Sequence, residues 1–213
     1  MTSSIIQPPH DCSLCPRLVE FRDENRNAYP NYFNAPVPSF GHIEAPLLIV
    51  GLAPGLKGAN QTGRPFTGDY AGDLLYATLF RQGLAEGNYD RRADDGFELR
   101  GVRVTNAVRC VPPKNKPAPF EIKTCLSFLE SEIAAMPALR VILSLGRIAH
   151  NSVVSTLGVK RKDHPFGHGA CTKEGDLMLV SSYHCSRYNT NTGVLTPKMF
   201  DAVVAKAKTA AGL

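Results

Sequence analysis

The side chains that could carry chemistry begin with four cysteines. Cys12 and Cys15 form a C-x-x-C pair, and Cys110 is followed by Cys125 after fourteen intervening residues. Four thiolates can hold a zinc ion or an iron–sulfur cluster. One close pair and one wide pair favour a cluster over zinc, because the corners of a cluster are ligated from different directions. The alternative for Cys125 is a small core residue on an apolar helix face.

A glycine-rich loop, "GLAPGLKGANQTGRPFTGD", follows the apolar run 47–50. Such a loop is typical of a phosphate site, but it lacks G-x-G-x-x-G and the P-loop lysine, which disfavours an enzyme acting on free nucleotides. The loop contains Phe66, which either anchors the loop on the core or forms a stacking platform for a planar ring. It ends at Asp69, which either caps the next helix or orients water and stabilises a developing cation.

Two further polar residues follow other apolar runs. Asn106 carries both a donor and an acceptor, enough to read one edge of a pyrimidine, or it satisfies backbone groups at a strand end. His184 can donate a hydrogen bond to an oxygen that gains negative charge. Arg187 and Tyr188 follow it in a polar segment that suits contact with phosphates or with a disrupted base pair.

Four short apolar runs are predicted to be buried strands, and they alternate with segments of helical periodicity. This pattern predicts one α/β domain over residues 1–213, with three layers (α/β/α) around a mostly parallel, four-stranded sheet. Residues 1–45 are expected to form an N-terminal extension that carries the C-x-x-C pair. Because ligands bind at the carboxyl ends of strands in such sheets, the polar residues above are expected to share one site. The predicted strands are Leu47–Val50, Val102–Asn106, Val141–Leu145 and Leu177–Ser181, and the predicted helices span 71–83, 121–136, 146–157 and a segment capped by Thr196.

The composition is that of a folded protein. The chain has 213 residues, of which 43% are hydrophobic and 20% charged, so disorder is not favoured. Its net charge of +5 fits an anionic partner but is common among proteins. Without a long apolar run or a secretory signal, a cytoplasmic protein with no membrane partner is expected. In a reducing compartment, its six cysteines are expected to be ligands, catalytic groups or buried thiols rather than disulfides.

Taken together, these motifs resemble those of the iron–sulfur uracil-DNA glycosylases, most closely the bacterial type-five branch. The resemblance rests on "GANQTGRPFTGDYAGDLL", "TNAVRCVPPKNKPAP", "HCSRYNTNTGVLT" and the cysteine pattern, in that order, and spans about residues 12 to 200. It implies a uracil-DNA-glycosylase-like fold and a monofunctional DNA repair enzyme. This enzyme would flip uracil, and also other deaminated bases, out of DNA and hydrolyse the N-glycosidic bond, leaving an abasic site. We expect a monomer that associates with the nucleoid through DNA binding.

The resemblance also implies a role for each candidate residue. Phe66 would stack on the flipped base, and Asn106 would hydrogen-bond its polar edge. His184 would stabilise charge on the departing base, while Asp69 would act at the sugar or position water. The remaining expected base-binding residues are Gly51, Ala53 and Asn189; the expected DNA contacts are Arg64, Lys114, Lys116, Arg187 and Tyr188; and Cys12, Cys15, Cys110 and Cys125 would hold a structural 4Fe-4S cluster.

One residue departs from the family pattern. The family has proline after the histidine, whereas this chain has Cys185, which puts the rigidity of His184 in doubt. Cys185 is expected as an exposed, oxidisable thiol beside the site, and neither it nor Cys171 is expected to be a ligand. The alternative function is a non-catalytic nucleic-acid-binding module with a metal ion or cluster, in which Asp69 and His184 are only structural.

Overall fold

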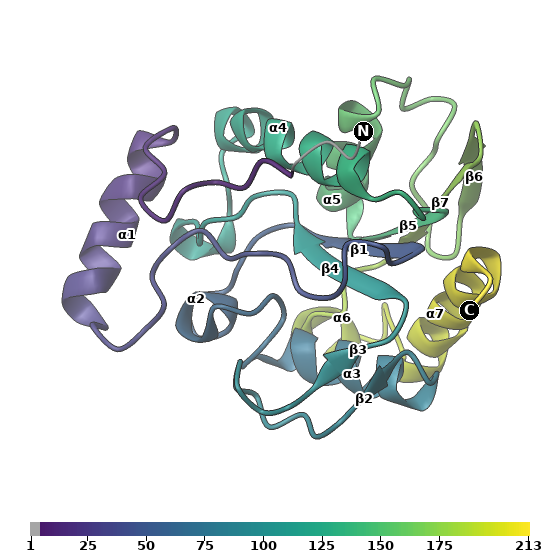
Figure 1. The fold of residues 1–213 in the computed structure, drawn as a ribbon, viewed down its shortest axis with the longest axis horizontal. Helices are drawn as coiled ribbons and strands as arrows, with labels where there is room; N and C mark the ends of the chain where they lie inside the picture. The colour runs from purple at the N-terminus through teal and green to yellow at the C-terminus, as the bar shows by residue number, and fades with distance from the viewer. Residues whose placement is uncertain (1–4) are drawn as a thin grey trace.

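The computed structural model describes residues 5–213, and a central sheet organises them (Figure 1). The order of its strands is β4-β1-β5-β7-β6. All neighbouring pairs are parallel except β6 and β7, which are antiparallel. The strands are β1 (Leu47–Gly51), β4 (Val102–Asn106), β5 (Val141–Leu145), β6 (Cys171–Glu174) and β7 (Leu177–Ser182).

The predicted fold class is confirmed, with one strand more than expected. All four predicted strands form, and their bounds differ from the prediction by at most one residue. The fifth strand, β6, has the sequence Cys-Thr-Lys-Glu and lies at the edge of the sheet, partly exposed. Because an exposed edge strand needs no apolar run, the pattern of hydrophobic residues did not reveal it.

Helices cover both faces of the sheet, as Figure 1 shows. Leu47 and Ile49 of β1 point into the core formed with α3 and α7, whereas Leu48 and Val50 point into the core formed with α4 and α5. Alternate residues of one strand are therefore buried on opposite faces, which explains why the buried strands read as continuous apolar runs. The helices are α3 (Tyr70–Arg81), α4 (Pro119–Ala135), α5 (Arg147–Thr156) and α7 (Pro197–Ala211).

The remaining elements lie around this three-layer core. Residues before β1 run along the free edge of β4, where Phe40 and Val104 exchange backbone hydrogen bonds of 2.9 and 2.7 Å. Within residues 5–213, no helix is long and apolar enough to cross a membrane. The smaller elements are α1 (Pro16–Ala28), α2 (Ala59–Thr62), α6 (Arg187–Asn191), β2 (Ala85–Glu86), β3 (Glu98–Leu99) and a 3-10 turn, η1 (Pro113–Asn115).

Candidate active site

A cavity of about 410 Å³ lies at the carboxyl edge of the parallel strands. The loop after β1, the end of β4, the turn η1 and the segment after β7 all contribute to it. This is the edge at which ligands of open parallel sheets bind. Its lining includes Ala53, Phe66, Asp69, Asn106 and His184 of the predicted site, together with Arg187.

Gly51, Phe66 and Asn106 are in close contact. A Cβ atom on Gly51 would lie 2.5 Å from Cζ of Phe66 and would also meet Oδ1 of Asn106. Phe66 is 7% exposed and its backbone has φ +54°, in the left-handed region. Glycine is therefore required at position 51, where the strand end meets the aromatic ring and the amide.

Asp69 both caps a helix and lines the cavity. Its Oδ1 accepts a hydrogen bond of 3.0 Å from the backbone N–H of Gly72, which confirms the predicted cap of α3. Its Oδ2 faces the glycine loop, where a Cβ on Gly55 would lie 3.1 Å away and one on Gly58 would clash. The glycines thus leave room around a carboxylate oxygen that the cap does not use.

His184 lies opposite Phe66 in this cavity. The centroids of the two rings are 6.3 Å apart and their planes differ by 29°. Burial lowers the pKa of His184, and the nearby charge of Asp69 only partly offsets this effect. The imidazole is therefore neutral at neutral pH and can donate one N–H hydrogen bond.

The segment that carries His184 is fixed without the proline that the family pattern has after the histidine. Asn189 donates from Nδ2 to the backbone oxygen of His184 at 2.8 Å, so it holds the histidine backbone and is not part of the cavity lining. Cys185 donates from Sγ to the backbone oxygen of Ala71 at 3.5 Å. The expectation of an exposed thiol at Cys185 is wrong, because this side chain is fully buried in the core and burial raises its pKa.

Arg64 was expected to contact DNA, and this prediction is wrong. Its side chain is 4% exposed and forms two hydrogen bonds of 2.8 Å to the carboxylate of Asp95. A guanidinium that is buried and paired in this way cannot reach a phosphate. No local sequence pattern indicates this pairing, because Asp95 lies in another loop, far along the chain from Arg64.

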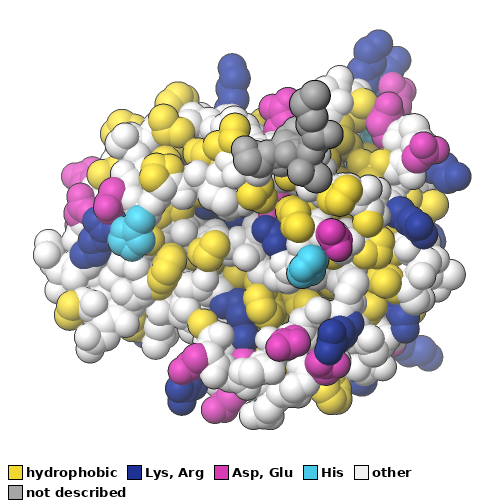
Figure 2. All heavy atoms as spheres, viewed as in Figure 1, with side chains coloured by type: hydrophobic (Ala, Val, Ile, Leu, Met, Phe, Trp, Pro, Cys, Tyr) yellow, Lys and Arg dark blue, Asp and Glu magenta, His cyan; other side chains and the backbone are white. Residues whose placement is uncertain are grey.

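The other predicted DNA contacts lie at the surface. Arg187 lines the cavity, with its guanidinium 5.4 Å from the ring centroid of Tyr70, and the neighbouring Tyr188 is 75% exposed. Lys114 and Lys116 are also exposed. Basic and acidic side chains are interspersed on the face shown in Figure 2, so the net charge alone does not locate a DNA surface.

Asn115 and Ser186 also line the cavity, although neither was predicted as a site residue. Asn115 lies between the two exposed lysines, and its backbone has φ +55°. Asparagine tolerates this left-handed conformation better than most residues. Nothing in the motif "PPKNKPAP" indicates that this loop reaches the cavity.

The four predicted ligand cysteines surround a second, small cavity of about 20 Å³. Cys12 and Cys15 come from the start of α1, Cys110 follows β4 and Cys125 lies on α4. Mostly apolar side chains complete the lining, together with Arg109 and Thr124. Within residues 5–213, no three His, Cys, Asp or Glu side chains are placed to share a single metal ion. Leu18, Val108 and Phe128 are among these apolar residues.

Polar and charged groups lie beside the cysteines. Burial, together with the neighbouring cysteines, raises the pKa of Cys110 to about 12. The backbone N–H of Arg109 donates to Sγ of Cys125 at 3.4 Å. Among residues 5–213, the Nε atoms of Arg22 and Arg109 are both buried and have no hydrogen-bond partner. An iron–sulfur group fits these surroundings, which offer four cysteine sulfurs, a backbone N–H that donates to one of them, and buried guanidinium groups. The reduction potential and stability of such a group depend on contacts of this kind.

Comparison with known proteins gives the class. A family model described as the uracil DNA glycosylase superfamily matches residues 38–208. The chain therefore belongs to the uracil-DNA glycosylase superfamily, which confirms the resemblance.

Individual relatives show which branch of the superfamily the chain is most similar to. It is 45% identical over 216 residues to the type-5 uracil-DNA glycosylase of Thermus thermophilus, covering 99% of this chain and 98% of that protein. It is 42% identical over 211 residues to the type-5 enzyme of Mycobacterium bovis, covering 95% and 79%. Identity to a type-4 uracil-DNA glycosylase of Pyrobaculum aerophilum is 33% over 180 residues, covering 84% and 77%. The similarity is thus strongest to the type-5 group among these three.

Proposed function

We propose that this protein removes uracil from DNA by hydrolysing the N-glycosidic bond, which leaves an abasic site for repair. The observation that carries the proposal is the convergence of an aromatic ring, an amide, an imidazole and a carboxylate on one cavity. Phe66, Asn106, His184 and Asp69 supply these groups. The names of the relatives support the same reaction.

The base is held in the flipped state. A base inside a duplex is inaccessible, so the enzyme extrudes it at a cost of a few kcal/mol. Stacking on Phe66, worth roughly 1–3 kcal/mol, offsets this cost. The amide of Asn106 pairs with the polar edge of the base. Gly51 leaves the room in which the Phe66 ring and this amide sit side by side, and Ala53 lines the cavity that receives the base. The cavity of about 410 Å³ also accommodates bicyclic bases, so the proposal extends to deaminated purines such as hypoxanthine.

Bond cleavage uses two groups on opposite sides of the broken bond. As uracil departs with its bonding electrons, negative charge grows on the base, and the N–H of neutral His184 donates to the oxygen that carries it. The deoxyribose becomes oxocarbenium-like, and the carboxylate of Asp69 stabilises that positive charge and orients the attacking water. The oxygen of this water bonds to C1′, and the proton that it releases ends on the uracil anion, which leaves as neutral uracil. Asn115, an exposed residue of the cavity lining, would contact the same nucleotide.

The flanking DNA is held by exposed groups around the cavity. Lys114 and Lys116 flank a cavity residue, and Arg187 itself lines the cavity, so these cations suit contact with phosphates. The exposed ring of Tyr188 suits insertion where the base pair is disrupted.

We further propose that Cys12, Cys15, Cys110 and Cys125 hold a 4Fe-4S cluster. When bound, this group would crosslink α1, α4 and the segment after β4, and it takes no part in hydrolysis. A cluster held by four thiolates carries net negative charge, which the buried guanidinium of Arg22 would offset, whereas that of Arg109 is ion-paired with Glu132. Zinc is the alternative for the same donor set.

The test of the function is direct. The purified protein is incubated with single- and double-stranded oligonucleotides that contain uracil or hypoxanthine, and alkali then cleaves any abasic sites. We expect strand cleavage at uracil, and loss of this cleavage in the Asp69→Asn variant. Binding to these DNAs without any cleavage would overturn the proposal in favour of a non-catalytic binding module.

A further inference from the structure

The segment Pro65–Gly68 carries the aromatic platform in a conformation that it would not adopt alone. Phe66 has φ +54°, which is rare for a bulky residue and persists only where its surroundings enforce it. The carbonyl oxygen of Phe66 also packs tightly against Gly72 in the first turn of α3. Since Asp69 begins this helix, the position of Phe66 is linked to that of the carboxylate.

Two tyrosine hydroxyls bind the backbone of this segment. Tyr89 accepts from the N–H of Gly68 at 3.4 Å and donates to the carbonyl oxygen of Phe66 at 3.5 Å. Tyr76 donates to the carbonyl oxygen of Pro65. Both sides of the left-handed residue are thereby held by side chains from other elements, which is what such a conformation requires.

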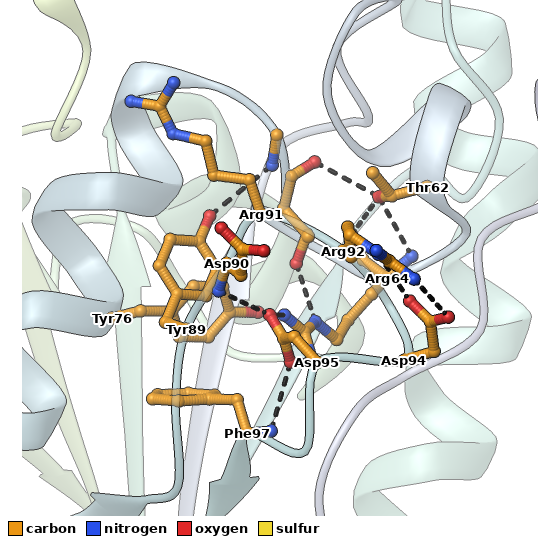
Figure 3. A network of polar contacts seen from close by, with 12 residues as sticks. Thr62, Arg64, Tyr76, Tyr89, Asp90, Arg91, Arg92, Asp94, Asp95 and Phe97 are labelled. Carbon is orange, nitrogen blue, oxygen red and sulfur yellow. Dashed lines mark hydrogen bonds and ion pairs between the residues drawn. The ribbon is translucent and has the colours of Figure 1, made fainter.

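Arg64 fixes the same segment through a second set of contacts (Figure 3). Its Nε donates to Oγ1 of Thr67 at 2.8 Å, while its two terminal nitrogens bind Asp95. Asp95 in turn accepts from the backbone N–H groups of Asp90 and Phe97 at 2.9 and 3.0 Å. The ion pair therefore ties the loop that bears Phe66 to the loop between β2 and β3.

The guanidinium of Arg64 is also enclosed by aromatic rings. Four ring centroids lie between 5.0 and 5.8 Å from its Cζ. Apolar residues of the same volume would stabilise the fold about as well as a buried ion pair does. We therefore look for the role of the Arg64–Asp95 pair in the conformation that it fixes. The rings belong to Phe40, Tyr76, Tyr89 and Phe97.

We propose that Tyr89 and the Arg64–Asp95 pair are positioning residues for base capture. They hold the Phe66 ring against Gly51 and Asn106 so that it meets a flipped base without rearrangement. None of the three lines the cavity, so they act through Phe66 and not on the substrate. This inference rests on the proposed glycosylase function.

A double-mutant cycle tests this dependence on Phe66. Single-turnover cleavage of a uracil-containing oligonucleotide is measured for Tyr89→Phe in the wild-type and Phe66→Ala backgrounds. We expect Tyr89→Phe to slow cleavage roughly fivefold in the wild type and less than about twofold beside Phe66→Ala, as residues that act as one unit do. Equal losses in both backgrounds would overturn the proposal.

A matched control and a second variant complete the test. Tyr32→Phe also removes one hydroxyl, from a ring that stacks on Tyr29 in the segment after α1, and it should leave the rate unchanged. For Asp95→Asn, fluorescence of 2-aminopurine beside a non-cleavable 2′-fluoro-deoxyuridine reports base flipping. We expect less flipping in this folded variant, and unchanged flipping would count against the proposal. An inactive wild type would instead refute the glycosylase function itself.

Discussion

The rings of Phe66 and His184 face each other in one cavity, with centroids 6.3 Å apart and planes 29° apart. The two residues come from loops that follow different strands of the sheet, β1 and β7. A planar base that lies on Phe66 therefore comes within reach of the imidazole. Binding and bond cleavage can then be tested separately, because one ring holds the base and the other acts on its developing charge.

Replacing His184 with alanine should slow cleavage far more than it weakens DNA binding. Loss of one well-placed donor to a developing negative charge typically costs about 10²–10³ in rate. Single-turnover cleavage gives the rate, and anisotropy with a non-cleavable uracil analogue gives the affinity. Equal losses in both would contradict the catalytic assignment.

The pH dependence of cleavage tests the protonation state of His184. Burial lowers its pKa below the ordinary value of 6.5, so the neutral form prevails at neutral pH. If the neutral donor is the active form, the rate is constant above pH 6.5 and falls only when acidification protonates the ring. The pH–rate profile of the wild type, compared with His184→Ala, measures this. A rate that rises on acidification through the same range would show that the cation is required.

Gly51→Ala should abolish base capture. The added Cβ would lie 2.5 Å from the Phe66 ring and would meet Oδ1 of Asn106, so the platform or the amide must move. We expect at least a hundredfold loss of cleavage and about 1–3 kcal/mol lower stability from overpacking. Gly167→Ala is the matched control, since its Cβ would meet nothing closer than 3.5 Å. Near-normal activity in Gly51→Ala would contradict the proposed pocket.

The sequence predicted the framework of the site well, because local rules determine it. Apolar runs located the four buried strands, and short-range capping chemistry placed Asp69 at the start of α3 and Thr196 at the start of α7. The carboxyl-edge rule then brought Phe66, Asn106 and His184 together before any geometry was known.

The parts that failed depend on contacts between distant segments. Arg64 looked like a surface cation because its partner Asp95 lies in another loop, and no periodicity links the two. Cys185 looked exposed because its neighbours are polar, yet it turns into the core beside Ala71. Burial of a single residue in a loop is decided by the whole fold and leaves no local pattern.

Acid should weaken the Arg64–Asp95 ion pair and so lower the stability that it contributes. Burial would raise the pKa of Asp95, but its hydrogen bonds to Arg64 and to backbone N–H groups outweigh this and lower the pKa to about 2. Near pH 3, the carboxyl group of Asp95 is therefore protonated more often in the unfolded chain than in the folded protein. The stabilisation of the folded state by the ionised carboxylate is present above about pH 4 and is lost as the pH falls toward 2. Urea unfolding should show the stability gap between wild type and Asp95→Asn narrowing by about 2 kcal/mol over that range. A constant gap would contradict the assignment.

The cysteine cavity makes a prediction that does not depend on activity. If Cys110 is a cluster ligand, Cys110→Ala removes one of four thiolates, so the purified protein should lose iron and visible absorbance, and its unfolding temperature should fall. Cys171→Ala is the matched control, because Cys171 lies on the edge strand β6 away from this cavity. Iron content by elemental analysis distinguishes the outcomes. If the wild type contains zinc and no iron, the group held by the cysteines is zinc and not a cluster. Equal metal content in the Cys110→Ala and Cys171→Ala variants would exclude Cys110 as a ligand.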